Sequence, residues 1–346
     1  MTKGFAVHVP DGFFNAAVSV SAGAVAAAGL AVCLRGARRE LDDRTAPMAG
    51  LVAAFIFAVQ MLNFPVAAGT SGHLLGGALA AILVGPYTGV LCMAVVLLVQ
   101  CVFFADGGLT ALGINITIMG IVTVLVGWGV FRLVARLAKG KGGVTVAAFL
   151  AALVSVPSAA LVFSALFWVG GTAPIEVSAV AAAMGSVHVL IGIGEGVITA
   201  LTVGAVLAVR PDLVYGARGL TTPLVLRGAE PATVGTTVTV GAEEEPVAAR
   251  SPLRAFLLGG LGLTLVLAGI VSFFASSSPD GLEAVAENHG FLGQATGHMF
   301  GSWALADYGD VGGIPVGVAG IIGVGLVLLI AGGVAYAARG REKARV

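Results

Sequence analysis

The sequence contains 346 residues, of which 58% are hydrophobic and only 10% are charged, and its mean hydropathy is +1.02. This composition excludes an ordinary soluble domain and is typical of an integral membrane protein, so the lipid bilayer is an expected partner. The formal net charge is zero. No basic surface for nucleic acid is therefore expected.

Apolar runs separated by turn signals predict an all-α integral membrane fold with nine spans. A bilayer core requires about 20 apolar residues per helix. Seven spans are expected at 13–34, 48–66, 74–86, 88–105, 110–131, 144–169 and 184–209, and two more at 255–275 and 314–337. The run at 74–86 is short, so we expect it to be tilted, broken or re-entrant.

Polar stretches divide the chain into two membrane domains. Residues 7–210 are predicted to form a seven-span helical bundle, and residues 254–346 a two-span module with an outer loop. Between them, residues 211–253 are rich in Pro, Thr and Gly and include the acidic run Glu243–Glu245. This composition is typical of a solvated linker.

Basic residues indicate the orientation in the membrane. They cluster in segments that are therefore placed in the cytoplasm, at 35–44, 132–141, 210–254 and 339–346. The segments expected outside are 67–74, 106–109, 170–183 and 276–313, with the N-terminus outside and the C-terminus inside. The first run is not expected to be a cleaved signal peptide, because its positive charge mostly follows it.

Two of the five histidines stand in predicted outer segments. His8 precedes the first span beside the turn signal Pro10-Asp11-Gly12, and His73 precedes the third run. Imidazole is a frequent ligand of transition metals. We interpret the two histidines as a metal site, and the alternative is two unrelated polar loop residues.

Polar groups inside the spans form a second set of candidates. His188 and Glu195 are seven positions apart and share one helical face, and ionisable groups within a span normally face a bundle interior or a watery cavity. The alternative is a helix-packing pair. Further candidates for a cavity wall, each also typical of an interhelical hydrogen bond, are Gln60, Asn63, Gln100 and Asn115. His289 and His298 are expected to be solvated and not to be ligands.

Three stretches resemble motifs of a known family. Val7–Phe13 (VHVPDGF), Gly69–Gly77 (GTSGHLLGG) and His188–Ala200 (HVLIGIGEGVITA) resemble, in this order, the CbiM/NikM family. Its members are substrate-binding S components of energy-coupling-factor transporters for cobalt and nickel. Ser278–Glu283 (SPDGLE), with Leu305–Gly309 downstream, is similar to the PDGLE domain, which resembles the small N component in role. The chain therefore resembles a fused M–N protein.

The resemblance implies capture of Co(II) or Ni(II) at the outer face of a bacterial plasma membrane, together with a transmembrane T component and two ATPase subunits. It implies metal ligation by the nitrogen of Val7, two nitrogens of His8 and the ring of His73. The candidates for contacts around these ligands or in the cavity are Asp11, Asn63, Ser71, His188 and Glu195. A tetragonal nitrogen set favours Ni(II), while cobalt stays open because selection also depends on geometry and metal supply.

The N-terminus departs from the family pattern. The family uses a terminal amine as the first ligand, whereas Met1–Ala6 precede Val7 here. We expect residues 1–6 to be an extension that the working protein lacks, through a start codon at position 7 or through processing after Ala6. If the extension is retained, another donor must complete the metal site.

Two other functions are compatible with the residues. A self-contained, proton-coupled metal transporter would use His188 and Glu195 as a proton relay. A membrane metalloenzyme would use His8 and His73. The sequence has no P-loop motif, so this chain is not expected to hydrolyse ATP in the P-loop manner. The resemblance implies that separate subunits hydrolyse ATP and that this chain is a transporter subunit and not an enzyme.

Overall fold

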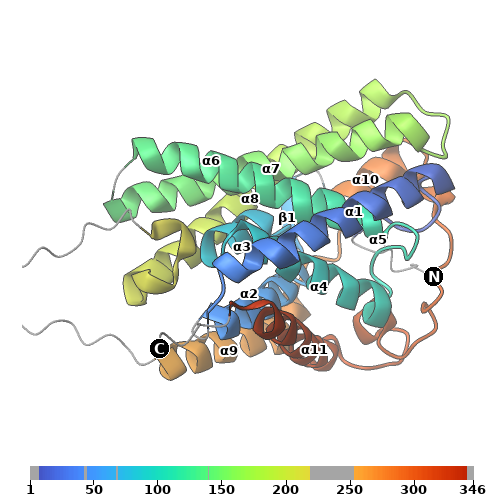
Figure 1. The fold of residues 1–346 in the computed structure, drawn as a ribbon. Helices are drawn as coiled ribbons and strands as arrows, with labels where there is room; N and C mark the ends of the chain where they lie inside the picture. The colour runs from blue at the N-terminus through green and yellow to red at the C-terminus, as the bar shows by residue number, and fades with distance from the viewer. Residues whose placement is uncertain (1–7, 43–44, 68, 139, 219–252, 341–346) are drawn as a thin grey trace, which may run out of the picture.

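A computed structural model of the chain describes residues 8–42, 45–67, 69–138, 140–218 and 253–340. The described chain is mostly helical, and its long helices run side by side (Figure 1). Within it, 7 helical segments are long and apolar enough to cross a membrane. The predicted all-α integral membrane class is therefore confirmed.

The helices of the first domain are α1 (Ala16–Gly36), α2 (Thr45–Gln60), α3 (Gly77–Val84), α4 (Pro86–Phe104), α5 (Leu112–Asn115), α6 (Thr123–Leu137), α7 (Gly140–Gly170) and α8 (Val177–Val209). The π-helix η2 (Ile116–Val122) joins α5 to α6, and the strands β1 (Phe64–Ala67) and β2 (Thr70–Gly72) pair antiparallel. The C-terminal module contains α9 (Leu253–Gly269), α10 (Gly281–Asn288) and α11 (Val316–Ala338). Short helical turns are η1 (Ala37–Arg39), η3 (Pro211–Leu213), η4 (Tyr215–Ala217), η5 (Val271–Phe274), η6 (Leu292–Gln294) and η7 (Ala306–Gly309).

Two of the nine predicted spans are shorter than predicted. α2 ends at Gln60 instead of near position 66, because Pro65 lacks an N–H and disfavours helix at the residue before it. The chain turns there into the β1–β2 hairpin. α3 has only 8 residues, all of them buried, and glycines with positive φ stand on both sides, Gly76 at 89° and Gly85 at 98°. α3 therefore lies inside the bundle, as expected for a broken or re-entrant run.

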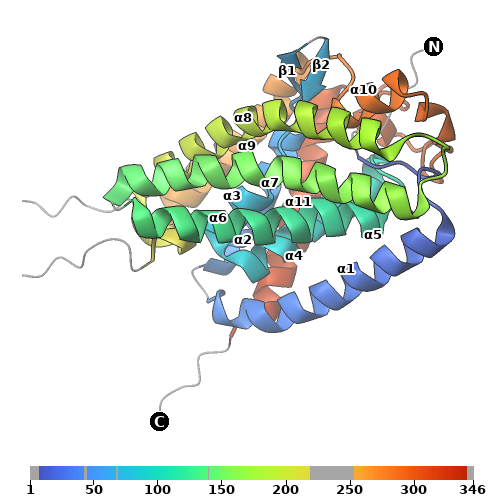
Figure 2. The same cartoon turned by 90° about the horizontal axis from the view of Figure 1, so that it is seen from above.

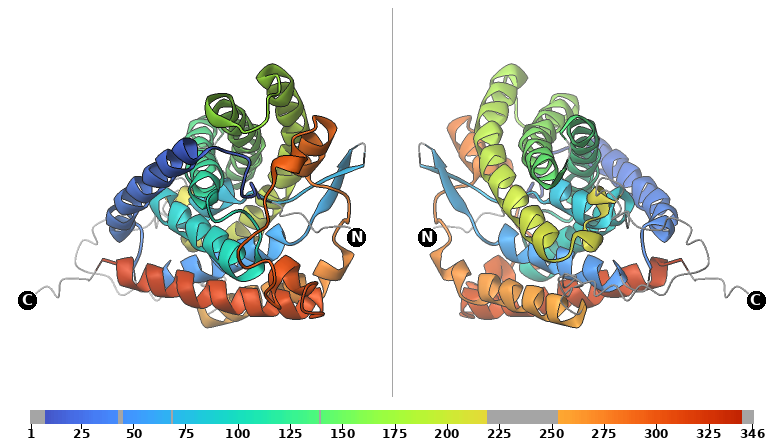
Figure 3. Two further views of the ribbon diagram at one scale, coloured as in Figure 1. Left: turned by 90° about the vertical axis from the view of Figure 1, so that its right-hand side faces the viewer. Right: turned by 90° about the vertical axis from the view of Figure 1, so that its left-hand side faces the viewer.

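The C-terminal module docks on the first domain. α9 and α11 pack against α2, and α11 also contacts α4 (Figure 3). Small residues permit this close approach, since a Cβ at Gly50 would lie 3.1 Å from the Cα of Gly332.

The segment after α8 also packs on the first domain. Leu213, Val214 and Ala217 are buried, so the prediction of a solvated linker is wrong for residues 211–218. The remainder of the predicted linker, including Glu243–Glu245, lies outside the described residues.

Segments predicted to lie outside the membrane meet around the β1–β2 hairpin and α10 (Figure 2). The backbone N–H of Ser71 donates to the carbonyl of Pro279 (2.8 Å), and its hydroxyl donates to the carbonyl of Ser278 (2.8 Å). The backbone N–H of Thr296 donates to the carbonyl of Asp11 (2.9 Å). The outer segment of the C-terminal module is thus bound to the hairpin and to the N-terminal loop.

Candidate metal centre

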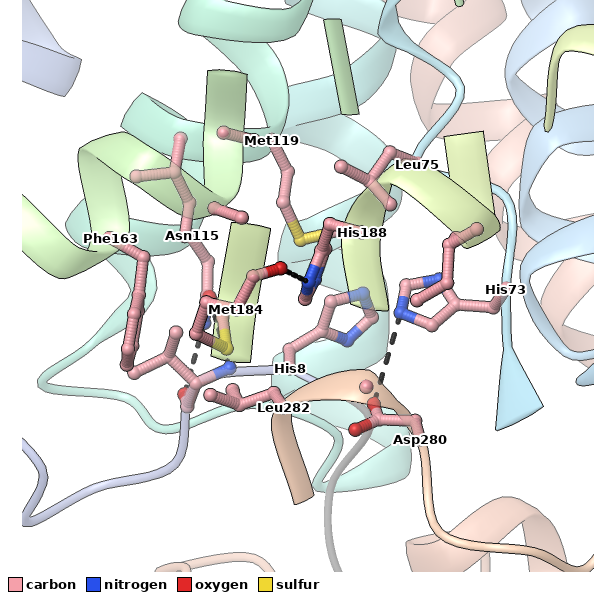
Figure 4. A pocket seen from close by; sticks show the side chains of 16 residues that line it. His8, His73, Leu75, Asn115, Met119, Phe163, Met184, His188, Asp280 and Leu282 are labelled. Carbon is pink, nitrogen blue, oxygen red and sulfur yellow. Dashed lines mark hydrogen bonds and ion pairs between the residues drawn. The ribbon is translucent and has the colours of Figure 1, made fainter. Parts of the chain in front are cut away.

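A cavity of about 50 Å³ lies where the N-terminal loop, the β2–α3 loop, α8 and the start of α10 meet (Figure 4). Its polar wall consists of His8, His73, Asn115, His188 and Asp280. Most of the remaining wall is apolar and includes Met119, Phe163, Met184 and Leu282. Both membrane domains therefore contribute to one cavity.

His8 is held by polar side chains that follow α4. Its Nδ1 lies 2.9 Å from Oδ1 of Asp106, and its backbone N–H donates to the same oxygen (3.3 Å). Asn115 accepts from the N–H of Val9 and donates to the carbonyl of Val9, both at 3.1 Å. His8 is only 2% exposed, and its Nε2 has no hydrogen-bond partner within the described chain. The ring is therefore fixed through Nδ1, and Nε2 has an unused lone pair or proton.

His73 stands in the loop between β2 and α3, opposite His8. The two ring centroids are 5.4 Å apart, and the ring planes meet at 71°. Nδ1 of His73 lies 3.0 Å from the carbonyl oxygen of Leu74. Burial, together with the charge of His8, lowers the pKa of His73 to about 4. At neutral pH the ring is therefore neutral, which is the form that ligates metals.

Glu195 supports the His73 loop from outside the cavity. Its two carboxylate oxygens accept the backbone N–H groups of Leu75 (2.6 Å) and Gly76 (3.0 Å). Glu195 does not line the cavity, so the cavity half of its prediction is wrong. Its role as a contact around the metal ligands stays a prediction, and its carboxylate binds the backbone of the loop that carries His73.

His188 reaches the cavity from α8. Its Nδ1 lies 2.8 Å from the carbonyl oxygen of Met184, one turn earlier in the same helix. His188 and Glu195 therefore contact different parts of the chain. A cavity-facing position for His188 agrees with the expectation for an ionisable group inside a span.

Asp280 was not predicted as a site residue, although it lies in the SPDGLE motif. It caps α10 by accepting the backbone N–H of Glu283 (2.7 Å), and its Oδ2 lies 4.0 Å from Nε2 of His73. Burial raises the pKa of Asp280 to about 7. The pKa of His73 is lowered, so both shifts disfavour the charged forms and the 4.0 Å approach is not a strong ion pair.

Asp106 is a second acid that was not predicted as a site residue. Its Oδ2 accepts a hydrogen bond from the hydroxyl of Tyr308 in the C-terminal module (2.6 Å). A sequence signal for this role existed, because Asp106 is the only charged residue between positions 45 and 131.

Three further candidates do not line the cavity. Asp11 accepts from the backbone N–H of Thr110 (2.7 Å) and so shapes the loop before α5. The hydroxyl of Ser71 donates a hydrogen bond to the carbonyl of Ser278. Asn63 lies before β1 and is absent from the cavity wall. The cavity half of the prediction is therefore wrong for all three, and the other half, contacts around the metal ligands, stays a prediction.

Two glutamines donate hydrogen bonds from long helices to segments outside them, the loop before α3 and the turn η7, and not to other membrane helices. Gln60 donates to the carbonyl of Leu75 (3.0 Å), and Gln100 donates to the hydroxyl of Tyr308 (3.2 Å). Neither lines the cavity.

The two outer histidines differ from each other. His289 is half-buried and does not line the cavity. His298 is also half-buried, with its Nε2 3.8 Å from Sγ of Cys101 and its Nδ1 accepting from the backbone N–H of Phe300 (3.0 Å). The expectation of a merely solvated side chain is therefore wrong for His298, because the outer segment packs on α4.

The cavity side chains do not stand at the mutual distances that coordination of one ion requires. Among the described residues, no group of three or more His, Cys, Asp and Glu side chains is arranged to hold a metal ion. An ion would have to draw the cavity side chains toward itself.

Comparison with known families assigns both membrane domains. Residues 8–213 match the CbiM family, described as a cobalt uptake substrate-specific transmembrane region, and residues 254–340 match the PDGLE domain. A protein of Archaeoglobus fulgidus, provisionally named fused nickel transport protein NikMN, is 40% identical over 208 residues, which cover 60% of this chain and 68% of that protein. The cobalt transport protein CbiM of Sorangium cellulosum is 36% identical over 189 residues, which cover 53% of this chain and 83% of that protein.

A solved structure of a truncated transition metal transporter is also similar. Its TM-score is 0.53 at 28% sequence identity, and the match covers 58% of this chain and 98% of that one. The first domain therefore shares both sequence and fold with metal transporters. The chain belongs to the CbiM family of cobalt and nickel transport proteins of the membrane, and it carries a PDGLE domain after the CbiM region.

Proposed function

We propose that this chain is the binding subunit that captures Co(II) or Ni(II) at the outer face and passes the ion inward, within an energy-coupling-factor transporter that has a T component and two ATPase subunits. The approach of His8 and His73, with ring centroids 5.4 Å apart in one buried cavity, carries the proposal. Two imidazoles from distant segments supply a donor type that suits Co(II) and Ni(II).

The proposed ligand set also includes the backbone nitrogen of His8 and the terminal nitrogen of Val7. The N–H and Nδ1 of His8 both face Oδ1 of Asp106, at 3.3 and 2.9 Å. Two nitrogens that point to one position are what a chelate through both requires, and an ion bound there would replace the carboxylate oxygen. Val7 lies outside the described residues. The intact mass of natively expressed protein tests its role, because a mature chain that begins at Met1 has no amine at Val7.

A proton relay through His188 and Glu195 receives less support. Both oxygens of Glu195 accept backbone N–H groups of the loop before α3, whereas His188 contacts Met184. A secondary transporter built on this pair would have to break the loop contacts of Glu195 in every cycle.

The test is uptake of radioactive Co(II) and Ni(II) by cells that lack their own high-affinity uptake. Uptake should require the T component and active ATPase subunits. His73→Ala should weaken metal binding at least about tenfold, since even the loss of a residue that only supports a ligand commonly costs this much. His289→Ala, outside the cavity, is the control and should have no effect. Uptake that persists without the ATPase subunits and stops when the proton gradient collapses would overturn the proposal.

A further inference from the structure

Two of the cavity histidines are held in the same tautomer. Nδ1 of His73 faces the carbonyl oxygen of Leu74 at 3.0 Å, and Nδ1 of His188 faces the carbonyl oxygen of Met184 at 2.8 Å. A carbonyl oxygen can only accept a hydrogen bond, so Nδ1 of each neutral ring carries the proton. The lone pair of each ring is therefore on Nε2.

His8 follows the same rule through a carboxylate. Its Nδ1 lies 2.9 Å from Oδ1 of Asp106, and an ionised carboxylate likewise only accepts. Nε2 of His8 is buried and has no hydrogen-bond partner in the part of the chain that the structure describes. A ring that donates one N–H to a carboxylate and keeps the other nitrogen free is the usual arrangement of a metal-ligating histidine.

The three rings line one cavity, and Figure 4 shows those of His8, His73 and His188 gathered around it. Two imidazoles bound to one ion through metal–nitrogen bonds of about 2 Å have ring centres roughly 5 Å apart. The observed separation of His8 and His73 is 5.4 Å. The spacing of the two rings is therefore compatible with binding of both to one ion.

We propose that the cavity contains a second metal position, formed by the Nε2 atoms of His8, His73 and His188, which requires no terminal amine. This inference rests on the proposed function and extends it, because it assigns His188 as a ligand and Asp106 as a residue that orients His8. The fourth ligand is the carboxylate of Asp280, whose Oδ2 lies 4.0 Å from Nε2 of His73. Three imidazoles and one carboxylate suit Co(II) and also accept Ni(II).

The second position differs from the chelate in the side of the His8 ring that it uses. The chelate uses the backbone N and Nδ1 of His8 and displaces Asp106. The second position uses Nε2 and keeps the contact between Nδ1 and Asp106. His8 thus contributes to both positions, through different ring nitrogens, and only the second position includes His188.

Titration of the purified full-length chain with Co(II) tests the assignment. His188→Gln should weaken Co(II) binding at least about tenfold, because a ligand is lost. His289→Gln is the matched control and should leave the affinity unchanged. Both variants should elute as the same monodisperse species as the unchanged chain. An unaltered affinity in a folded His188→Gln chain would overturn the inference.

A second measurement needs no variant. Paramagnetic proton NMR of the Co(II)-loaded full-length chain should show three exchangeable, strongly shifted N–H signals, one for each Nδ1–H of a ring bound through Nε2. All three should vanish in deuterated water. Fewer than three such signals would overturn the assignment even if His188→Gln fails to fold.

Failure of this inference is distinguishable from failure of the proposed function. If His73→Ala abolishes Co(II) binding but His188→Gln does not weaken it, the second position is wrong and capture by His8 and His73 stands. If neither His8→Ala nor His73→Ala changes uptake, the proposed function itself is wrong, and this inference falls with it.

Discussion

Asp106 connects the N-terminal loop to the C-terminal module through one buried carboxylate. Oδ1 accepts from both nitrogens of His8 that face it, and Oδ2 accepts from the hydroxyl of Tyr308. Burial alone would raise the pKa of Asp106, but the charge of His8 and the hydrogen bonds from His8 and Tyr308 outweigh burial and lower this pKa. The folded chain therefore favours the carboxylate form, which holds the His8 ring in one orientation.

Tyr308→Phe should destabilise the chain. It removes the donor to Oδ2 of Asp106 (2.6 Å) and the acceptor for Gln100 (3.2 Å). A hydrogen bond to a charged group contributes about 1.5–3 kcal/mol, so the free energy of unfolding in detergent should fall by about 2 kcal/mol. Tyr336→Phe, at a side chain that is 63% exposed, should change it by less than about 0.5 kcal/mol. Equal effects of the two variants would contradict this role of Tyr308.

Asn115→Leu should weaken metal binding as well as stability. The amide of Asn115 is the partner of the buried N–H of Val9, the residue next to His8. Leaving that N–H without a partner costs about 1–3 kcal/mol, and His8 loses its support, so metal affinity should fall about tenfold. Thr264→Val removes a buried hydroxyl in α9, far from the cavity, and should leave affinity unchanged. Calorimetric titration with Co(II) compares the two.

Part of the candidate site could be predicted from the sequence alone. His8, His73 and His188 stand out because ionisable residues are rare in an apolar chain, and the structure places all three at one cavity. Asp280 and Tyr308 could not be assigned in the same way, since their neighbours are set by docking of the C-terminal module and not by local pattern. For Glu195, helical periodicity indicated a side chain that faces the bundle interior. It could not show that backbone N–H groups of another segment would donate hydrogen bonds to both carboxylate oxygens.

At the scale of elements, hydropathy locates every membrane run, but it does not show what covers each helix. α2 and α3 are as apolar as the lipid-facing helices, yet nearly all of their side chains are buried by other helices. An apolar run can be buried by lipid or by protein, and the two give the same pattern. The hairpin at 64–72 was not predicted, because its first strand falls at the end of the span expected at 48–66.

Packing of α11 on α2 should depend on one glycine. A Cβ at Gly323 would overlap the ring of Phe57, whereas a Cβ at Gly325, two positions later, would meet nothing within 4 Å. Overpacking costs about 1–3 kcal/mol, so Gly323→Ala should lower the free energy of unfolding by that amount, and Gly325→Ala should not lower it. The thermal midpoint of each variant in detergent is the measurement. A stable Gly323→Ala chain would show that α11 does not pack on α2 as described.

At the scale of the whole molecule, the segments predicted to lie outside come together at one end. The contacts that join them to one another and to the N-terminal loop include the bridge between Phe14 and Gly171 and the hydrogen bonds from Gly108 to Val9 (2.9 Å) and from Ser71 to Pro279 (2.8 Å). At the other end, the N–H of Gly340 donates to the carbonyl of Leu41 (3.4 Å). The charge bias predicted this grouping without any knowledge of contacts. The contacts agree with the grouping, and the orientation in the membrane stays a prediction.

Cysteine labelling in intact cells should reveal which end faces outward. Ser277 and Lys141 are both exposed, and positive-inside bias places Ser277 outside and Lys141 in the cytoplasm. A membrane-impermeant maleimide should therefore modify Ser277→Cys but not Lys141→Cys.

Disruption of the membrane is the control for that experiment, since it should make both sites reactive. Background should be low, because the native Cys33, Cys92 and Cys101 are all buried. Labelling of Lys141→Cys alone would place the cavity of His8 and His73 at the cytoplasmic end. An ion could then reach the cavity only after crossing the membrane, which is incompatible with capture from outside.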